Sequence, residues 1–513
     1  MIGVLSRHDT SCAESSSPRG GAATIVCLLS AVALCALCAR PVLAETLDEA
    51  LANAYLINPS LNSERARLRA TDEQVAIAKS GFRPNINASG DAAFQNSDSD
   101  LAGGGGNSNQ QTCNSPQRLA EPGFCAFLDS GSLSTNTSNE GITHPRGYAV
   151  TLSQPIFEGF QNLNALRQAK ASVQAGRESL RIVEQTTLLN AVTAYVDVVR
   201  DQAVVKLRQS NVDVLSEQLR QTKDRFNVGE VTRTDVAQAE ARRSDAITQL
   251  YAAQANYKSS RATYEQVIGH PPSDLSYPTT IAHLLPTGLD ESMTLADGQN
   301  PLILNTVYLE EASLYNVNQI LGELLPQVSL EAQYAQRFDE SKTLIEQETT
   351  TVMGRVNVPL YQGGGVAARI RQAKEANNQL KKQVEDARLT IHAEVISNWA
   401  QLQATASEIQ SAQSSLDANG IALEGVREEE KVGQRTTLDV LNAQLEYLGS
   451  QIQLVTAKRD RVVAEYALYS SVGRLDAQSL GLSVPYYDPL EHYDTIKNKW
   501  FGLKPPPPPA PDE

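Results

Sequence analysis

The 513-residue sequence lacks proline over two long stretches, at positions 156–270 and 360–484. Proline breaks helices because it removes an amide donor and clashes with the preceding turn. Its absence permits helices far longer than the average of about 11–12 residues. In the first stretch Leu188, Val192 and Tyr195 begin an apolar stripe at spacings of three and four residues. Both stretches are therefore predicted to hold very long helices.

An excess of basic residues is also missing, and the formal net charge is −15. Affinity for nucleic acid depends on clustered Lys and Arg that neutralise phosphates. No basic stripe occurs in the chain, so nucleic acid is excluded as a partner.

Catalytic and metal-binding motifs are absent as well. The glycine runs at 103–106 and 363–365 are not followed by the Lys-Ser/Thr of a phosphate loop. No metal-ligand spacing joins the six histidines, which are His8, His144, His270, His283, His392 and His492. The sequence therefore predicts no enzyme, no cofactor and no metal site.

Few cysteines remain after the first 44 residues. Arg7 and Arg19 precede an apolar run at 22–39, and a small-residue pattern ends at Ala44. This pattern predicts a signal peptide, 1–44, that is cleaved after Ala44. A retained membrane anchor is the alternative, because the apolar run exceeds the usual signal core of about 7–15 residues.

The two cysteines of the mature chain are Cys113 and Cys125. An even pair in an oxidising compartment predicts a disulfide between them. The Cys35-x-x-Cys38 pattern resembles a redox motif, but it lies in the apolar signal core and is discounted.

The chain carries an internal duplication, which fixes the architecture before any local motif. Asn58-Pro59 returns as Asn300-Pro301. At a second constant offset, Pro155, Gln168-Ala169-Lys170, Val228-Gly229, Asp235 and Gly269 return as Pro359, Gln372-Ala373-Lys374, Val432-Gly433, Asp439 and Gly473. The first copy spans 45–269 and the second 298–473. They are followed by the segments 270–297 and 474–513, the latter ending in a proline-rich tail, and the family resemblance given below implies that both are equatorial segments.

Each copy is predicted to contain a helix, two strands, a very long helix and a further helix. In the first copy these are a helix at 46–80, strands at about 85–96 and 146–156, and helices at 163–226 and 234–268. In the second copy a helix is followed by strands at about 327–338 and 350–360, and by helices at 366–430 and 437–472.

The predicted strands alternate apolar and polar residues. Val328, Leu330 and Tyr334, for example, interleave with polar side chains. Such segments are typical of transmembrane β-barrels, which must close because hydrocarbon leaves edge amides unsatisfied. Four strands cannot close, and a dimer's eight would enclose almost no channel. The sequence therefore predicts an α+β membrane protein that forms a homotrimer with 12 strands and 12 helical columns.

Two proline-anchored strand-to-helix connections and two helical turns carry a family resemblance. The connections are at 154–159 and 358–364, and the turns are at 225–236 and 432–441. With them the chain resembles the TolC family of trimeric outer-membrane efflux and secretion channels. The resemblance implies a trimeric 12-stranded transmembrane β-barrel, in the outer membrane of a Gram-negative bacterium, continued by a periplasmic 12-helix α-barrel.

The family conducts passively through a tube that polar links close at the periplasmic end. The matching gate residues here are Thr234, Asp235, Arg435 and Asp439. Arg435 and Asp439 are four residues apart and are predicted to share one helical face. Two positions depart from the family, with Glu430 in place of a tyrosine and Asn442 in place of an acidic residue. Glu428, Glu429 and Glu430 are predicted to add negative charge at the mouth.

The same turns are implied to dock a periplasmic adaptor, at Val228, Gly229, Val432 and Gly433. An inner-membrane ABC or RND transporter is implied as the energy source, and outer-membrane lipid surrounds the barrel. The main alternative is that the chain is itself a periplasmic adaptor with long helical hairpins. A fibrous coiled-coil protein is a second alternative, which the alternating strands disfavour.

Overall fold

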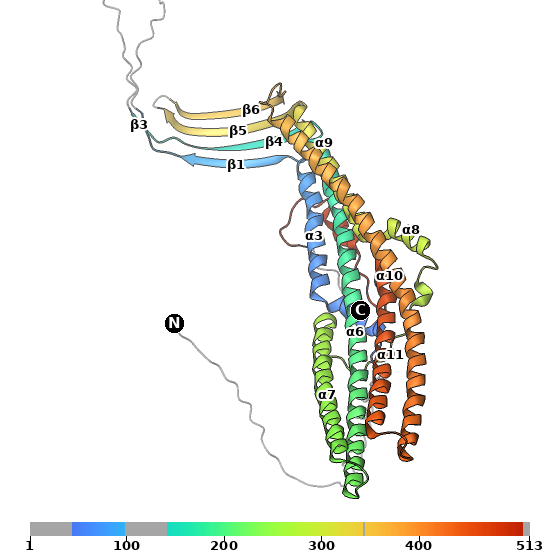
Figure 1. Ribbon diagram of the computed structural model, residues 1–513. Helices are drawn as coiled ribbons and strands as arrows, with labels where there is room; N and C mark the ends of the chain where they lie inside the picture. The colour runs from blue at the N-terminus through green and yellow to red at the C-terminus, as the bar shows by residue number, and fades with distance from the viewer. Residues whose placement is uncertain (1–43, 98–140, 342–343, 506–513) are drawn as a thin grey trace, which may run out of the picture.

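The computed structural model describes residues 44–97, 141–341 and 344–505. A curved sheet projects from one end of a bundle of long helices (Figure 1). The predicted signal peptide, except Ala44, and the predicted Cys113–Cys125 disulfide lie outside the described residues. Within those ranges, no helix combines the length and the apolar character needed to cross a membrane.

Two helices run uninterrupted through the bundle. They are α6, Gln161–Asn227, and α10, Gly365–Lys431, each of 67 residues. At about 1.5 Å per residue, each spans roughly 100 Å. Their partners in the two hairpins are α7, Arg233–Ile268, and α11, Thr437–Ser471. All four lie within two residues of the ranges predicted from the proline-free stretches.

The single helix predicted at 46–80 is wrong. The chain forms α2, Leu47–Ile57, and α3, Pro59–Ser80, with a break at Asn58. The Asn58 side chain accepts hydrogen bonds from the first amides of α3, and Pro59 occupies the first helical position, where no amide donor is needed. Because this cap starts a new helix, α2 can leave the axis of α3.

The break also joins the helices of a column end to end. Asn58 Nδ2 donates to Val267 O at 2.9 Å, at the end of α7. In the second copy Asn300 Nδ2 donates to Ser471 O at 2.8 Å, at the end of α11. The recurring Asn-Pro therefore stacks α3 on α7, and α9 on α11. With α6 and α10 these stacks make the four helical columns that the sequence predicts.

The second copy has a matching pair of helices, α8, Leu289–Gln299, and α9, Pro301–Leu321, followed by a short 3-10 turn, η2, Gly322–Leu324. Helix α8 crosses the predicted boundary at 297, so the equatorial segment and the second copy are not separated there. The cap at Asn300 marks the actual break.

The sheet has the antiparallel order β1-β4-β5-β6. The register aligns Ala88, Val150 and Tyr334 on one face, and places Thr151 and Glu331 on the other. Arg355 pairs with Glu331 at 3.2 Å on that polar face. The predicted alternation therefore gives one apolar and one polar face. The strands are Asn85–Ala92, Arg146–Glu158, Gln327–Ser341 and Leu344–Asn357.

Two predicted strands have different bounds. The range 85–96 divides into β1 and β2, Gln95–Ser97, and β2 pairs with β3, Gly141–Thr143, in a separate small ladder. The range 350–360 is β6, which begins at Leu344 and ends before Pro359. Proline cannot donate to the ladder, which explains the earlier end.

A collar surrounds the middle of the bundle. We use this name for α2, the segment 274–285 with its 3-10 turn η1 (Ala282–Leu284), and the segment 475–487. Together with α6, α7 and α11 they enclose the main apolar core, which includes Leu51, Leu188, Tyr195, Tyr264, Tyr466 and Leu475. Tyr195 Oη lies 2.8 Å from Glu45 O and 2.7 Å from Ser276 O. One buried hydroxyl therefore contacts both the chain just before α2 and the segment 274–285.

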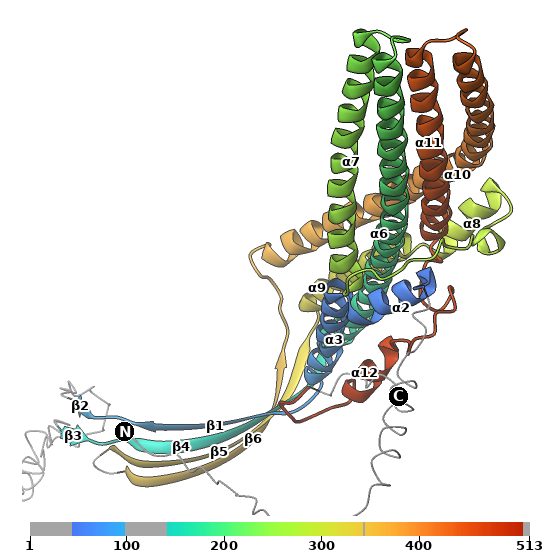
Figure 2. The ribbon, with the colours of Figure 1, turned by 90° about the horizontal axis from the view of Figure 1, so that it is seen from below.

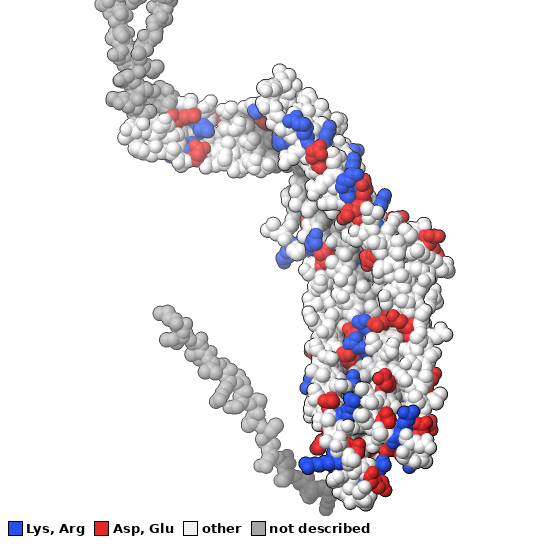
Figure 3. Space-filling view, viewed as in Figure 1, with Lys and Arg blue, Asp and Glu red and all other residues white. Residues whose placement is uncertain are grey.

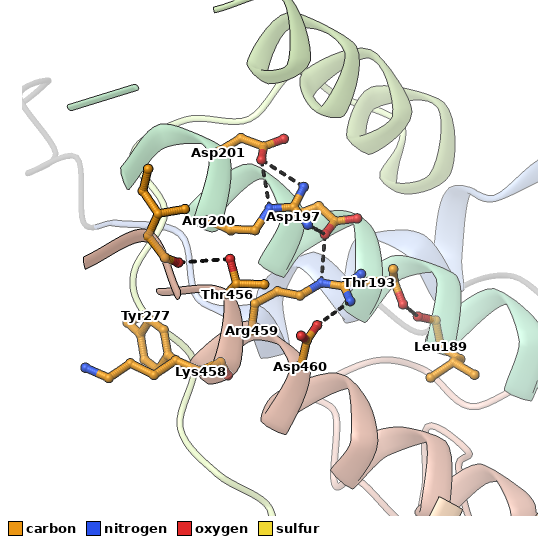
Figure 4. A network of polar contacts seen from close by, with 11 residues as sticks. Leu189, Thr193, Asp197, Arg200, Asp201, Tyr277, Thr456, Lys458, Arg459 and Asp460 are labelled. Atoms are coloured by element: carbon orange, nitrogen blue, oxygen red, sulfur yellow. Dashed lines mark hydrogen bonds and ion pairs between the residues drawn. The ribbon is translucent and has the colours of Figure 1, made fainter. Parts of the chain in front are cut away.

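Charged side chains reinforce the contact between α6 and α11 at the same level (Figure 4). Arg459 Nε is 2.8 Å from Asp197 Oδ1, across the two helices. Arg200 pairs with Asp197 at 3.1 Å and with Asp201 at 2.8 Å along α6. The two hairpins are therefore fastened to each other at the collar.

Candidate functional site

The turns of the two hairpins lie next to each other at the end of the bundle farthest from the sheet (Figure 1; Figure 2). Helices α6 and α10, which lead into these turns, both end in a Schellman motif. Glu230 N donates to Arg225 O at 3.0 Å, and Gln434 N donates to Glu429 O at 2.9 Å. This geometry needs a left-handed residue one position earlier.

Glycine supplies that residue in both turns. Gly229 has φ 81° and Gly433 has φ 78°. Glycine adopts this region without steric cost, whereas a side chain would be strained. The repeated Val-Gly therefore has a local structural cause. The valines before the glycines, Val228 and Val432, are 73% and 71% exposed and form the outermost apolar surface of each tip.

Two of the predicted gate carboxylates cap helices. Asp235 Oδ2 accepts from Thr232 N at 2.8 Å, and Asp235 N donates to Thr232 Oγ1 at 3.3 Å. Asp439 and Thr436 repeat this box with 2.9 Å and 3.3 Å. The backbone amide of the capping threonine, followed by its hydroxyl, lowers the pKa of each carboxyl. The spacing Thr-x-x-Asp is a capping signal that is visible in the sequence, and capping is the ordinary structural role of such residues near helix ends.

The predicted common face of Arg435 and Asp439 is wrong. Arg435 precedes Thr436, the N-cap of α11, and therefore lies outside the helix. Its Nε is 2.8 Å from Glu429 Oε2, in the same tip. Hydrogen bonding to Glu429 raises the pKa of Arg435.

The three consecutive glutamates at the end of α10 do not leave a surplus of negative charge as predicted. Glu428 pairs with Lys431 at 2.6 Å, Glu429 pairs with Arg435, and Glu430 pairs with Arg225. Figure 3 shows basic and acidic side chains side by side at this end of the molecule. Each glutamate thus has a cation within its own subunit.

Two contacts link the first hairpin to the second at the tips. Arg225, at the end of α6, pairs with Glu430, at the end of α10. Arg242 Nη2 donates to Asn442 Oδ1 at 3.0 Å between α7 and α11. We call them the tip links. Both positions that depart from the family, Glu430 and Asn442, are therefore occupied in contacts between hairpins.

The basic partners of the tip links were not predicted. Arg225 and Glu430 are 205 residues apart in sequence, and no local pattern connects them. The Glu430 side chain is only 14% exposed, against 39% for Arg225, so the carboxylate is mostly covered when the link is made. From the sequence, Glu430 is predicted to be an unpaired charge at the mouth of the channel. A carboxylate that is mostly covered needs a cationic partner, which here is Arg225.

Behind the tips, α6 and α10 border a groove of about 800 Å³. Among its charged lining residues acidic ones outnumber basic ones, and the lining includes Asp213, Glu217, Glu424, Arg427 and Tyr447. Val440 and Tyr447 of α11 also line the groove, and so does Glu430, whose carboxylate pairs with Arg225 at the tip.

Thr234 is exposed on the first turn of α7. Within the part of the chain that the structure describes, no contact joins Thr234 or Asp235 to Arg435. Within one subunit, Glu430 therefore contacts Arg225, and Asn442 contacts Arg242. The predicted contact between Thr234 of the first tip and Arg435 of the second does not form within the subunit.

The duplicated hairpins, the four-stranded sheet and the tip geometry agree with the family model described as outer membrane efflux protein, which matches residues 47–270 and 293–474. The chain belongs to this family. Outer membrane efflux protein BepC of Brucella suis is 40% identical over 468 residues, covering 90% of this chain and 93% of BepC. Outer membrane protein TolC of Escherichia coli is 24% identical over 463 residues, covering 85% and 84%.

Among solved structures, the CmeC outer membrane channel of Campylobacter jejuni superposes with a TM-score of 0.72 at 16% identity, covering 88% of this chain and 89% of CmeC. The resemblance to the TolC family is confirmed, and the adaptor and fibrous alternatives are excluded. The protein is an outer-membrane efflux or secretion channel that protrudes into the periplasm. Its family consists of transporters without enzymatic activity, and membership implies a homotrimer within a tripartite assembly.

Proposed function

We propose that the tips form a closed periplasmic gate, which opens when an adaptor and a transporter dock. The channel itself conducts passively. The observation that carries this proposal is the pair of tip links, which tie the two hairpins of a subunit where the tube ends. Above them the hairpins share the collar core, so the free ends are the parts able to separate.

Closure of the barrel supports three subunits. In one subunit β1 and β6 are the edges of the sheet. An open edge inside a membrane leaves amides unsatisfied, so the edge β1 of one subunit pairs with the edge β6 of the next. Three subunits give 12 strands and place six tips around one axis.

A second set of links joins neighbouring subunits in this proposal. Arg435 is half-exposed and pairs only within its tip through Glu429, among the described contacts. Thr234 is exposed on the other tip. In a ring of alternating tips, Arg435 of one subunit then faces Thr234 and the capped Asp235 of the next. Exposed charges rearrange at little cost, so Arg435 can exchange partners.

Reversing Arg435 tests the gate. Arg435→Glu is expected to raise single-channel conductance in planar bilayers and to increase entry of vancomycin, because it replaces attraction between tips with repulsion. The matched control is Arg220→Glu, because Arg220 pairs along its own helix with Glu217 and Asp224. Conductance equal to wild type in both variants, with normal trimers, would place Arg435 on an ordinary solvated surface.

Docking occurs on the outermost tips in this proposal, at Val228-Gly229 and Val432-Gly433. The partners are a periplasmic adaptor and, behind it, an inner-membrane ABC or RND transporter. Cysteines placed at Glu230 and Gln434, which complete the two Schellman motifs, are expected to crosslink to the adaptor in cells. A cysteine at Tyr251, exposed farther along α7, serves as the control. Crosslinks from Tyr251 alone would move the docking site to the side of the tube.

A further inference from the structure

The C-terminal segment runs beside α3 toward the sheet. It comprises the chain from Tyr487 through α12, Pro489–Ile496, to residue 505. Figure 2 shows α12 beside α3, on the side of the collar nearer the sheet. Tyr487 N donates to Tyr55 Oη at 3.0 Å, next to the start of α3, so this is where the segment leaves the collar.

Specific contacts hold the segment along the second half of α3. His492 Nδ1 lies 3.0 Å from Asp72 Oδ2, and both side chains are buried. Farther along, Lys79 Nζ donates to Asn498 Oδ1 at 2.8 Å. Later residues of the C-terminal segment contact later residues of α3, so the two run in the same direction. We call this C-terminal segment, residues 487–505, the strap.

The strap ends where the first strand begins. Arg83 Nη1 donates to Lys499 O at 3.0 Å, and its guanidinium lies 4.4 Å from the centre of the Trp500 ring. Strand β1 starts at Asn85, two residues after Arg83. The end of the strap is therefore fixed at the junction of the barrel and the helices, on the periplasmic side of the membrane.

Large apolar side chains are exposed at this point. Trp500, Phe501 and Leu503 are 60%, 87% and 103% exposed. At the junction between β6 and α10, Leu360 and Tyr361 are exposed to a similar degree. The strap thus adds its aromatic residues to the apolar rim of the barrel, which faces lipid.

The charges beside these residues also fit a lipid surface. Lys497, Lys499 and Lys504 flank the aromatic pair. Lys497 pairs with Asp494 at 2.6 Å, whereas no acidic residue occurs at 497–505 itself. Tryptophan is enriched where a membrane meets water, and lysine extends its ammonium toward lipid phosphates. Clusters of basic residues next to a membrane surface bind anionic headgroups.

We propose that residues 497–505 bind the periplasmic leaflet of the outer membrane, with Trp500, Phe501 and Leu503 among the upper acyl chains and Lys499 and Lys504 at the phosphates. The partner is phospholipid, because the exposed surface continues the lipid-facing rim of the barrel. Through α12 and α3 this contact ties the collar to the membrane.

Trp500 is its own reporter, because the chain has only one other tryptophan, Trp399. Full-length Trp399→Phe trimers are reconstituted in phosphatidylcholine and phosphatidylglycerol vesicles, with and without phosphatidylcholine brominated on the upper acyl chain. Bromine quenches tryptophan only at short range. The expected result is a marked loss of Trp500 emission with brominated lipid and protection from aqueous acrylamide.

A control tryptophan far from the sheet is made in the same chain, as Tyr251→Trp with Trp399→Phe and Trp500→Phe. It is expected to keep its emission with brominated lipid, since Tyr251 is exposed on α7. If Trp399→Phe lowers the yield of trimers, the difference between wild-type and Trp500→Phe spectra gives the same signal. Trp500 emission unchanged by brominated lipid overturns the proposal, whether acrylamide reaches the ring or another protein surface covers it.

Discussion

The collar and the tips are joined by the same helices but are held by different interactions. At the collar, α6 and α11 pack through an apolar core in which Leu188, Tyr195 and Tyr466 are almost wholly buried. Near the tips the corresponding cluster is small, with Val212, Leu215, Ala246, Leu250 and Leu441 at its centre. Closer to the tips, scattered buried side chains such as Leu219, Leu423 and Val440 continue the packing, together with the tip links and the capped turns.

This difference indicates which part of the tube can move. Burial of apolar surface stabilises by about 25 cal/mol per Å², so separating the hairpins at the collar would be costly. The tip links are one partly covered ion pair and one hydrogen bond, each worth on the order of 1 kcal/mol, so a docking partner can replace them with contacts of its own. The collar therefore acts as the fixed part and the tips as the adjustable part.

The largest expected effect comes from removing core atoms at the two levels of α6. Leu188→Ala at the collar is expected to cost about 2–5 kcal/mol, because the closed core cannot collapse onto the cavity. Leu215→Ala near the tip should cost less, about 1–2 kcal/mol, since its few neighbours border open solvent. Thermal unfolding of trimers followed by circular dichroism measures both. Equal losses would show that the tips are packed as firmly as the collar.

The next largest expected effect is a dependence of the free energy of unfolding on pH that arises in the collar and not at the tips. Burial raises the pKa of Glu184, on α6 against the Ala477 amide, from its ordinary 4.5 to about 7. Between these values the folded chain keeps a proton that the unfolded chain has released, so stability falls as pH rises from 4.5 to 7, by about 3 kcal/mol. Glu184→Gln should remove this fall. The control is Glu240→Gln on the exposed face of α7, which should keep the wild-type pH dependence.

Two glycines at the tip end of the second hairpin, Gly425 inside α10 and Gly433 in the turn after it, should respond to alanine with opposite signs. Gly433→Ala forces a side chain into a left-handed turn and should destabilise the second tip by about 1 kcal/mol. Gly425→Ala lies inside the helix with open space around the added atom and should stabilise it by about 0.5–1 kcal/mol. Amide hydrogen exchange at 436–441 is expected to speed up only in Gly433→Ala. The same exchange rates in both variants would mean that the Schellman turn does not hold the tip.

Much of this organisation follows from local sequence signals. The bounds of α6 and α10 could be predicted because proline is absent and the apolar spacing is helical throughout. The alternating strands likewise predicted the two faces of the sheet, since side chains in a strand alternate by geometry. The turns at Gly229 and Gly433 followed from their repetition.

Other features depended on contacts that no local pattern reveals. The Asn58-Pro59 break was present as a capping signal, but the predicted helix 46–80 ran through it. Its role in stacking α3 on α7 became visible only through the bond to Val267 O. The pairing of Arg225 with Glu430 joins residues in separate copies of the repeat, and sequence spacing says nothing about such a distance.

The most direct test of an adjustable tip and a fixed collar is a charge swap at Arg225 and Glu430, measured as single-channel conductance in planar bilayers. Arg225→Glu and Glu430→Arg alone should each raise conductance, because like charges then face each other across the groove. The double variant restores an opposite pair and should return conductance toward wild type, with equal trimer yields throughout. If the double variant conducts as much as the single ones, or if none of the three differs from wild type, this link does not hold the entrance closed.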